Sequence, residues 1–261
     1  MLSRNLEKAR SAYKAKDIEE MRKAHDETNK EPHKKEKGQY IKSLIYGGLD
    51  GIITTFAVVA GVAGASLSAG IVLILGFANL IADGLSMAIG DYLSTKAENE
   101  YNKAEYEREK WEVEHYPDGE KKELLEVYMN KGISKEDANT IVNIISKDKK
   151  LWVDTMMVEE LGIIQDDESP IKNALVTFFS FAVFGFVPLV IHLLTFVFPA
   201  IAVNPFVSAS ILTGSTLFFL GALKSKITER HWFSSGTEML VVGGLAAVAA
   251  YFVGVILAGL A

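Results

Sequence analysis

The chain contains no cysteine. This absence excludes a disulfide framework, a zinc site built on thiolates and a cysteine nucleophile. Basic charge is also in short supply, because 27 Lys and Arg residues stand against 33 Asp and Glu residues, for a formal net charge of −6. A protein that binds nucleic acid through a basic patch is therefore not expected.

Carboxylates are missing from a long stretch of the chain, residues 171–224, whereas residues 99–150 are dense in Glu, Lys and Asp. The ordinary overall composition, 49% hydrophobic and 23% charged, is thus the mean of two unlike populations. This distribution argues against a single soluble globule. The chain also lacks a glycine-rich phosphate loop, a G-x-S-x-G elbow and an H-E-x-x-H pair, so any transport would have to be driven by a gradient.

Long apolar runs make up much of the remainder. A helix needs about 20 mostly apolar residues to cross the hydrocarbon core of a bilayer. Five segments meet this requirement, namely residues 44–65, 70–93, 174–198, 206–223 and 239–261. We therefore predict an all-α membrane protein with five transmembrane helices and a helical insert between the second and third.

The charges that flank these segments predict their orientation, because an excess of Lys and Arg marks the cytoplasmic side. The loops at 66–69 and 199–205 carry no charge. The basic flanking residues all fall on the other side, and they are Lys34, Lys35, Lys37, Lys42, Lys224, Lys226 and Arg230. The N-terminus and the insert are then cytoplasmic and the C-terminus lies opposite. The membrane itself is left open: a vacuole, another organelle or the cell surface.

This pattern divides the chain into four parts. Residues 1–38 form a polar helix with a linker, 39–94 the first two spans, 95–169 the insert and 170–261 the last three spans. No breaker follows the second span, so it should continue as a helix to about His115. A turn at 117–119 and helices at 120–130, 134–146 and 149–161 complete the insert, with Ser134 as an N-cap.

Acidic residues of the insert recur at helical spacing. Glu105, Glu109 and Glu112 share one helix face, and Glu120 and Glu123 share a face of the next helix. Folded back across the turn, the two faces could converge, and a divalent cation would relieve the repulsion between the carboxylates. The alternative is a solvated helical face whose charge is balanced by neighbouring Lys and Arg side chains. Composition alone leaves both interpretations open.

Sulfur and carboxylate ligands come together later in the insert. Met156 and Glu160 are four residues apart and share a helix face, with Met157 alongside. A thioether next to a carboxylate suits a borderline transition metal better than calcium or magnesium. The alternative is that both methionines only fill the core of the insert.

Two carboxylates interrupt the apolar runs. Asp50 lies in the first span, and Asp83 lies in the middle of the second, with Met87 one turn later. A carboxylate at mid-membrane costs about 2.5–3.5 kcal/mol on insertion scales, so it usually faces a bundle interior or a water path. We therefore predict that Asp50 and Asp83 belong to a functional site. A hydrogen bond that serves only helix packing is the alternative.

Two further functions compete with transport. Glu112-x-x-His115 matches one half of the ligand set of di-iron carboxylate bundles, so a membrane-anchored di-iron oxidase or a metal-storage or sensor protein is the alternative. The second half of such a set is not found. A scaffold whose charged insert binds a protein partner is a third possibility, and it predicts no metal binding.

Several motifs together resemble one family. They are Tyr46-Gly-Gly-Leu-Asp50-Gly51, Phe56-Ala-Val-Val-Ala-Gly61, Ala82-Asp-Gly-Leu-Ser86-Met87-Ala88-Ile-Gly90-Asp91-Tyr92-Leu-Ser94, Met156-Met157-Val-Glu-Glu160-Leu161-Gly162, Gly221-Ala-Leu-Lys224 and Gly243-Gly-Leu-Ala-Ala-Val-Ala-Ala-Tyr251. With the acidic insert, they resemble the vacuolar iron transporter family from about residue 39 onward. Asp91 departs from the glutamate that is common there but keeps the charge. The first forty residues match no part of that family.

The resemblance implies a five-span homodimer in a lipid bilayer, not an enzyme, that exchanges cytosolic Fe²⁺ for protons. It implies that Asp50 and Met87 form the pathway between the first two spans of paired subunits. It also implies a ligand set in the insert, which comprises Glu109, Glu112, Glu120, Glu123, Met156, Met157 and Glu160. The residues do not fix the metal, because Fe²⁺, Mn²⁺, Co²⁺ and Zn²⁺ all accept such ligands.

Overall fold

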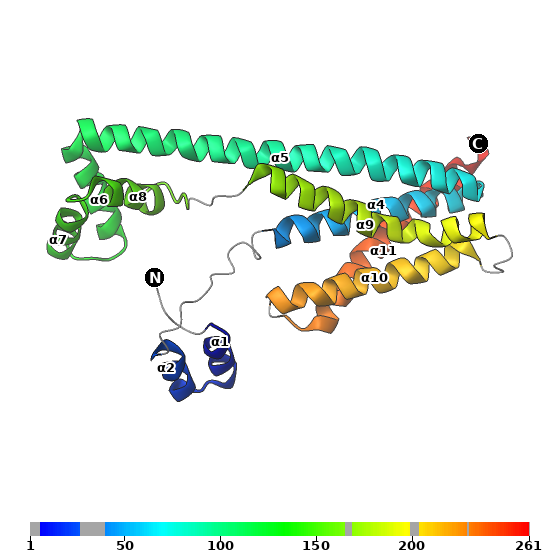
Figure 1. Ribbon diagram of the computed structural model, residues 1–261, viewed down its shortest axis with the longest axis horizontal. Helices are drawn as coiled ribbons and strands as arrows, with labels where there is room; N and C mark the ends of the chain where they lie inside the picture. The colour runs from blue at the N-terminus through cyan, green and yellow to red at the C-terminus, as the bar shows by residue number, and fades with distance from the viewer. Residues whose placement is uncertain (1–5, 27–39, 165–168, 199–203, 229, 261) are drawn as a thin grey trace. The chain divides into compact units, whose positions relative to one another are not determined.

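The computed structural model describes residues 6–26, 40–164, 169–198, 204–228 and 230–260. Every regular element in these ranges is a helix, which confirms the predicted all-α class. The chain divides into two units, Met1–Lys42 and Ser43–Ala261. Figure 1 shows both units, coloured from the N-terminus to the C-terminus.

The first unit contains two short helices, α1 (Leu6–Ala15) and α2 (Ile18–Asp26), where we had expected one. The break follows from Asp17, whose carboxylate accepts hydrogen bonds from the backbone N–H groups of Glu19 and Glu20 at 2.8 and 3.0 Å. An aspartate at this position starts a new helix. Ala12 and Ala24 are fully buried, one on each helix. The linker predicted to follow lies outside the described residues.

The second unit contains the five helices that are long and apolar enough to cross a membrane. They are α4 (Ile41–Gly64), α5 (Ala69–His115), α9 (Pro170–Val197), α10 (Pro205–Thr228) and α11 (Trp232–Leu257). The spans predicted from the sequence are therefore confirmed, with boundaries that shift by a few residues. The largest shift is at α11, which begins at Trp232 rather than Met239.

Small residues allow these helices to pack closely, as is usual between transmembrane helices. A Cβ atom on Gly51 of α4 would lie 2.3 Å from the carbonyl oxygen of Phe181 on α9. A Cβ atom on Gly254 of α11 would lie 2.0 Å from the carbonyl oxygen of Gly61 on α4. α4 is therefore held against both α9 and α11 at positions that only glycine can occupy.

A polar seam joins α5 to α9. The Thr177 hydroxyl donates to the carboxylate of Asp91, and the Asn173 amide donates to the Thr95 hydroxyl at 3.3 Å. Interhelical hydrogen bonds of this kind fix the register of two membrane helices. Asp91, the position that departs from the family pattern, is thereby assigned a packing contact.

The helix α5 runs without interruption for 47 residues, as the absence of a breaker predicted. Figure 1 shows α6, α7 and α8 gathered at its C-terminal end. Their bounds are Pro117–Asn130, Lys135–Ile145 and Lys149–Glu159. The prediction of a turn at 117–119 is wrong, because Pro117 begins α6. Proline suits the first position of a helix, where a backbone N–H would have no partner within the helix. Ser134 caps α7 as predicted, by accepting from the Asp137 N–H.

The insert has its own hydrophobic core. Its buried members are Val113 from α5, Leu124 from α6, Val142 from α7, and Trp152, Val153, Met156 and Met157 from α8. Because every helix of the insert contributes, this core fixes how the polar residues on the same helices are placed. The acidic residues considered below stand beside it.

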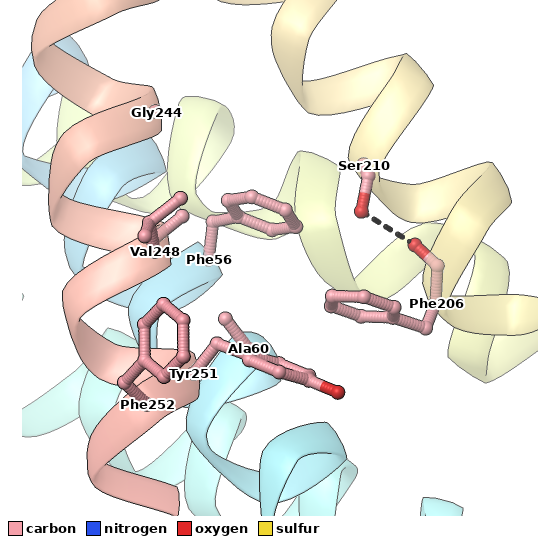
Figure 2. Close-up of a pocket in the computed structure, with 9 residues that line it drawn as sticks. Phe56, Ala60, Phe206, Ser210, Gly244, Val248, Tyr251 and Phe252 are labelled. Carbon is pink, nitrogen blue, oxygen red and sulfur yellow. Dashed lines mark hydrogen bonds between the residues drawn. The ribbon is translucent and has the colours of Figure 1, made fainter. Parts of the chain in front are cut away.

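An apolar cavity of about 350 Å³ lies between α4, α10 and α11. Figure 2 shows the aromatic rings around it. Phe206 stacks on both Phe56 and Tyr251, with ring centroids 6.4 and 5.9 Å apart. No carboxylate lines it, and neither Asp50 nor Asp83 is among its lining residues. This cavity therefore offers no carboxylate ligand for a cation.

Candidate metal centre

Five carboxylates of the insert converge although they are far apart in the sequence. Ligand oxygens of Glu109, Glu112 and Glu120 lie within 4.8 Å of one another, as do those of Glu120, Glu123 and Glu160. The chain reverses at Tyr116, which brings the first turns of α6 back onto the last turns of α5. Glu160 arrives from the end of α8, which packs against both helices. Glu120 belongs to both groups and links them.

Two of these carboxylates are buried, which distinguishes them from a solvated helical face. Glu109 is 1% exposed and Glu120 is 3% exposed. Their Oε2 atoms have no hydrogen-bond partner among the described residues. Buried polar atoms are almost always paired with protein, water or an ion, and an unpaired carboxylate oxygen is especially costly. Two such oxygens in one cluster indicate a place for a cation.

The burial and the crowding of the carboxylates raise their pKa values. Burial, and then the charge of Glu160, raises the pKa of Glu109 from 4.5 to about 7. Burial, and then the charge of Glu109, raises the pKa of Glu120 to about 7. The pKa of Glu160 is also raised by burial and by Glu123, to which its side chain is hydrogen-bonded. Near neutral pH the carboxylates of the cluster therefore hold protons that a metal ion would displace.

We expect the insert without metal to be less stable at pH 8 than at pH 5. A carboxylate whose pKa is raised on folding costs no stability below 4.5, costs progressively more as the pH rises to about 7, and adds no further cost above it. The shift of either group alone corresponds to about 3 kcal/mol. Denaturant unfolding of the full chain, followed by fluorescence of the buried Trp152 after Trp111 and Trp232 are replaced by Phe, measures this dependence.

Two comparisons make that experiment decisive. Replacing Glu109 and Glu120 by Gln should remove most of the pH dependence, because the variant lacks the two carboxylates whose pKa values are raised to about 7. Added Mn²⁺ should stabilise the unsubstituted insert more at pH 8 than at pH 5, because metal binds the ionised form. Equal stability at both pH values without metal would contradict the assignment of these two groups.

The methionines predicted as soft ligands are core residues of the insert. Met156 is 0% exposed and Met157 is 1% exposed. The carbonyl oxygen of Met156 accepts the backbone N–H of Glu160 at 3.0 Å, so this methionine lies one turn before a carboxylate of the cluster. Burial in the core and a ligand role are compatible here, and the ligand role remains a prediction.

Arg108 is a feature that the sequence interpretation missed. Its guanidinium contacts Glu105 at 2.8 Å, Glu109 at 2.9 Å and Glu112 at 3.4 Å. From the sequence we had treated it as one of many balancing charges. The useful signal was its spacing, since it lies three residues after Glu105 and four before Glu112. Glu105 pairs with Arg108 and belongs to neither converging group of the described residues.

His115, the second residue of the di-iron motif, has other contacts. Its ring stacks on Trp111 at 4.4 Å, and its Nδ1 lies 2.8 Å from the Trp111 carbonyl oxygen. His115 is exposed and is in neither converging group. Glu112 therefore joins the carboxylate cluster without the histidine that a di-iron pair requires.

The intramembrane candidates lie on α4 and α5. Asp50 and Asp83 are half-buried and close enough for their charges to interact. The Thr54 hydroxyl donates to the Asp50 carbonyl oxygen at 2.8 Å and accepts from the Asn79 amide at 3.5 Å. Met87 is half-buried one turn after Asp83 and packs against the hydrophobic core formed by the membrane helices. The same helix thus carries Asp83, Met87 and, further along, Glu109 and Glu112.

Comparison with known proteins identifies the family of the chain. A family model described as the VIT family matches residues 41–255. The chain belongs to the vacuolar iron transporter family. It is 42% identical to the vacuolar iron transporter of Toxoplasma gondii, over 97% of this chain and 89% of that protein. It is 36% identical to the vacuolar iron transporter of Plasmodium falciparum, over 98% of each, and 32% identical to vacuolar iron transporter 1 of Oryza sativa subsp. japonica, over 82% of this chain and 84% of that protein.

These comparisons correct one expectation. The alignments with the vacuolar iron transporters of Toxoplasma gondii and Plasmodium falciparum cover so much of the chain that they extend into its first forty residues. That segment therefore has counterparts within the family. The relatives are named as transporters, not enzymes, and this chain is a multi-pass membrane protein of that family.

Proposed function

We propose that this member of the vacuolar iron transporter family moves divalent metal, chiefly Fe²⁺, out of the cytosol in exchange for protons. The observation that carries the proposal is the pair of buried, unpartnered oxygens of Glu109 and Glu120. They belong to an insert built on the same helix that carries Asp83 and Met87 through the membrane segment. The relatives are named as iron transporters, and the ion proposed for this chain is the divalent form.

The insert is the collecting site in this proposal. Its oxygen ligands are Glu109, Glu112, Glu120, Glu123 and Glu160. Its soft sulfur ligands are Met156 and Met157 in the adjoining core. This mixed set favours borderline metals over calcium and magnesium, so Mn²⁺, Co²⁺ and Zn²⁺ are alternative substrates. The protonated state of the empty cluster means that binding releases protons to the cytosol.

The membrane step requires a group that accepts either a proton or a metal ion. Asp50 is the candidate, because a carboxylate must be ionised to bind a cation and its neighbour Asp83 disfavours two bare charges. Metal that leaves Asp50 and Met87 on the far side is replaced by a proton that returns. This competition couples metal export to proton entry without ATP.

Orientation and assembly complete the proposal. The flanking Lys and Arg residues favour a cytoplasmic insert. Small residues recur every fourth position on α5 and are exposed in the single chain, namely Ala78, Ala82, Ser86, Gly90 and Ser94. Such a stripe supports close packing against another membrane helix, which favours a homodimer with the first two spans at the interface.

Uptake by proteoliposomes tests the proposal. Purified protein should transport Fe²⁺ and Mn²⁺ added on the insert side, and it should leave Ca²⁺ and Mg²⁺ outside. A protease added before the assay removes the insert only where it faces outward. This treatment shows whether the insert faces the supplied metal. Metal binding without any uptake would contradict transport and would favour a store or sensor on a membrane anchor.

A further inference from the structure

A single guanidinium serves three carboxylates at the edge of the acidic cluster. Arg108 Nη2 lies 2.8 Å from Glu105 Oε2 and 2.9 Å from Glu109 Oε1, and Nη1 lies 3.4 Å from Glu112 Oε2. The Nε–H also donates to Glu105 at 3.1 Å. The Arg108 side chain is 47% exposed, whereas that of Glu109 is 1% exposed. The cation thus reaches from the solvent edge into the buried site.

Arg108 engages two of the three carboxylates that could hold one metal ion, namely Glu109 and Glu112 of the group with Glu120. Glu109 gives one oxygen to Arg108 and leaves the other without a partner. Glu112 is engaged by the same guanidinium. A divalent cation held by Glu109, Glu112 and Glu120 would therefore meet a fixed positive charge at two of its three ligands. In a partly buried site this repulsion is much stronger than in bulk water.

We propose that Arg108 is a displaceable counter-ion, which neutralises the empty cluster and withdraws toward Glu105 when a divalent metal binds. The inference rests on the proposed function, because it takes the cluster to be the site that collects the transported metal. Glu105 can retain the guanidinium alone, since its Oε2 already accepts from both Nε and Nη2. Glu105 is then a positioning residue for Arg108 and not a metal ligand.

A transporter needs such a device because it must release what it collects. Binding in a transport path has to be favourable enough for entry and weak enough for exit. A cluster of carboxylates without an internal cation would hold a divalent ion strongly and give it up slowly. Arg108 lowers the affinity and accelerates release, because it returns to Glu109 and Glu112 as the metal leaves.

The test uses the purified full chain with Mn²⁺ as the probe, at a pH above 8. We expect Arg108→Gln to bind Mn²⁺ about tenfold more tightly, with most of the change in the dissociation rate measured by chelator chase. Arg108→Lys keeps the charge but loses the planar guanidinium with its several N–H donors. Its Mn²⁺ affinity should lie between those of the wild type and Arg108→Gln. The matched control is Lys110→Gln, which removes a charge paired at 3.8 Å with Glu107, outside the cluster, and should alter the affinity by less than about twofold.

A double-mutant cycle separates the two roles of Glu105. If Glu105 acts through Arg108, Glu105→Gln should weaken Mn²⁺ binding in the wild-type background and have no effect in the Arg108→Gln background. If Glu105 is itself a ligand, its loss weakens binding equally in both backgrounds. If Arg108→Gln folds poorly, Arg108→Met, which also removes the charge, replaces it in the cycle.

The outcomes separate this inference from the function on which it rests. Tighter binding and slower release in Arg108→Gln, with Lys110→Gln unchanged, supports the counter-ion role. Unchanged or weaker binding in Arg108→Gln, with a wild-type protein that binds Mn²⁺, overturns the counter-ion role alone. A wild-type protein that binds no Mn²⁺ overturns the collecting site and the inference together.

Discussion

Replacing Asp50 by asparagine is expected to abolish metal flux while metal binding to the insert stays intact. The neutral amide keeps the size of the side chain but can neither lose a proton nor bind a cation as a carboxylate does. The insert lies beyond the membrane part of α5, and none of its candidate metal ligands lies on α4, which carries Asp50. The affinity of the insert for metal should therefore not change. Flux into proteoliposomes and Mn²⁺ binding, both measured on one preparation, check the two halves of this result.

The matched control for that variant is Asp154→Asn. Asp154 is an exposed residue of α8, outside both converging groups. It undergoes the same chemical change and should transport at the wild-type rate. Wild-type flux in Asp50→Asn would remove Asp50 from the pathway and would require another proton-carrying group.

The second large effect is expected from replacing Glu109 and Glu120 together by glutamine. These are the two buried carboxylates with unpartnered oxygens, and Glu120 is shared by both converging groups. We expect Mn²⁺ affinity at the insert to fall by at least about 100-fold, because even residues that only support metal ligands cost 10–100-fold. Equilibrium binding to the full chain measures this, and transport at low metal concentration should fall with it.

The control uses carboxylates from the same two helices. Glu107→Gln and Glu126→Gln remove exposed charges that pair with Lys110 and Lys122 at 3.8 and 3.9 Å. The net charge of this double variant equals that of the Glu109 and Glu120 double variant. If both double variants lost affinity equally, the cluster would act only as a diffuse negative field, and the assignment of a buried site would be contradicted.

The sequence predicted the features that depend on local patterns. Long apolar runs predicted the five spans, and the lack of a breaker after residue 93 predicted the long helix α5. Spacing placed Glu109 with Glu112 and Glu120 with Glu123. The spacing could not show which helix face is buried, because Glu109 and its neighbour Glu107 differ only through the docking of α6 and α8.

Other features required the folded chain. Glu160 reaches the cluster from a helix that begins some distance later in the sequence, so no local pattern joins it to Glu120, and only the resemblance to the family had placed the two in one ligand set. The division of the first unit into two helices depends on the side chain of Asp17, which starts α2. Among so many charged residues, the sequence does not single out Asp17 for this role. The contacts of Arg108 with three carboxylates depend on the conformation of its side chain in the folded cluster. Composition alone does not distinguish Arg108 from the other charged residues.

The most direct test of the account is a simultaneous record of metal uptake and luminal pH in proteoliposomes with an acidic lumen. Metal supplied on the insert side should enter faster than it does without the gradient, and the lumen should become alkaline in proportion to the metal taken up. Vesicles without metal should keep their gradient, which controls for proton leak. Uptake that ignores the gradient and leaves luminal pH unchanged would contradict proton-coupled export.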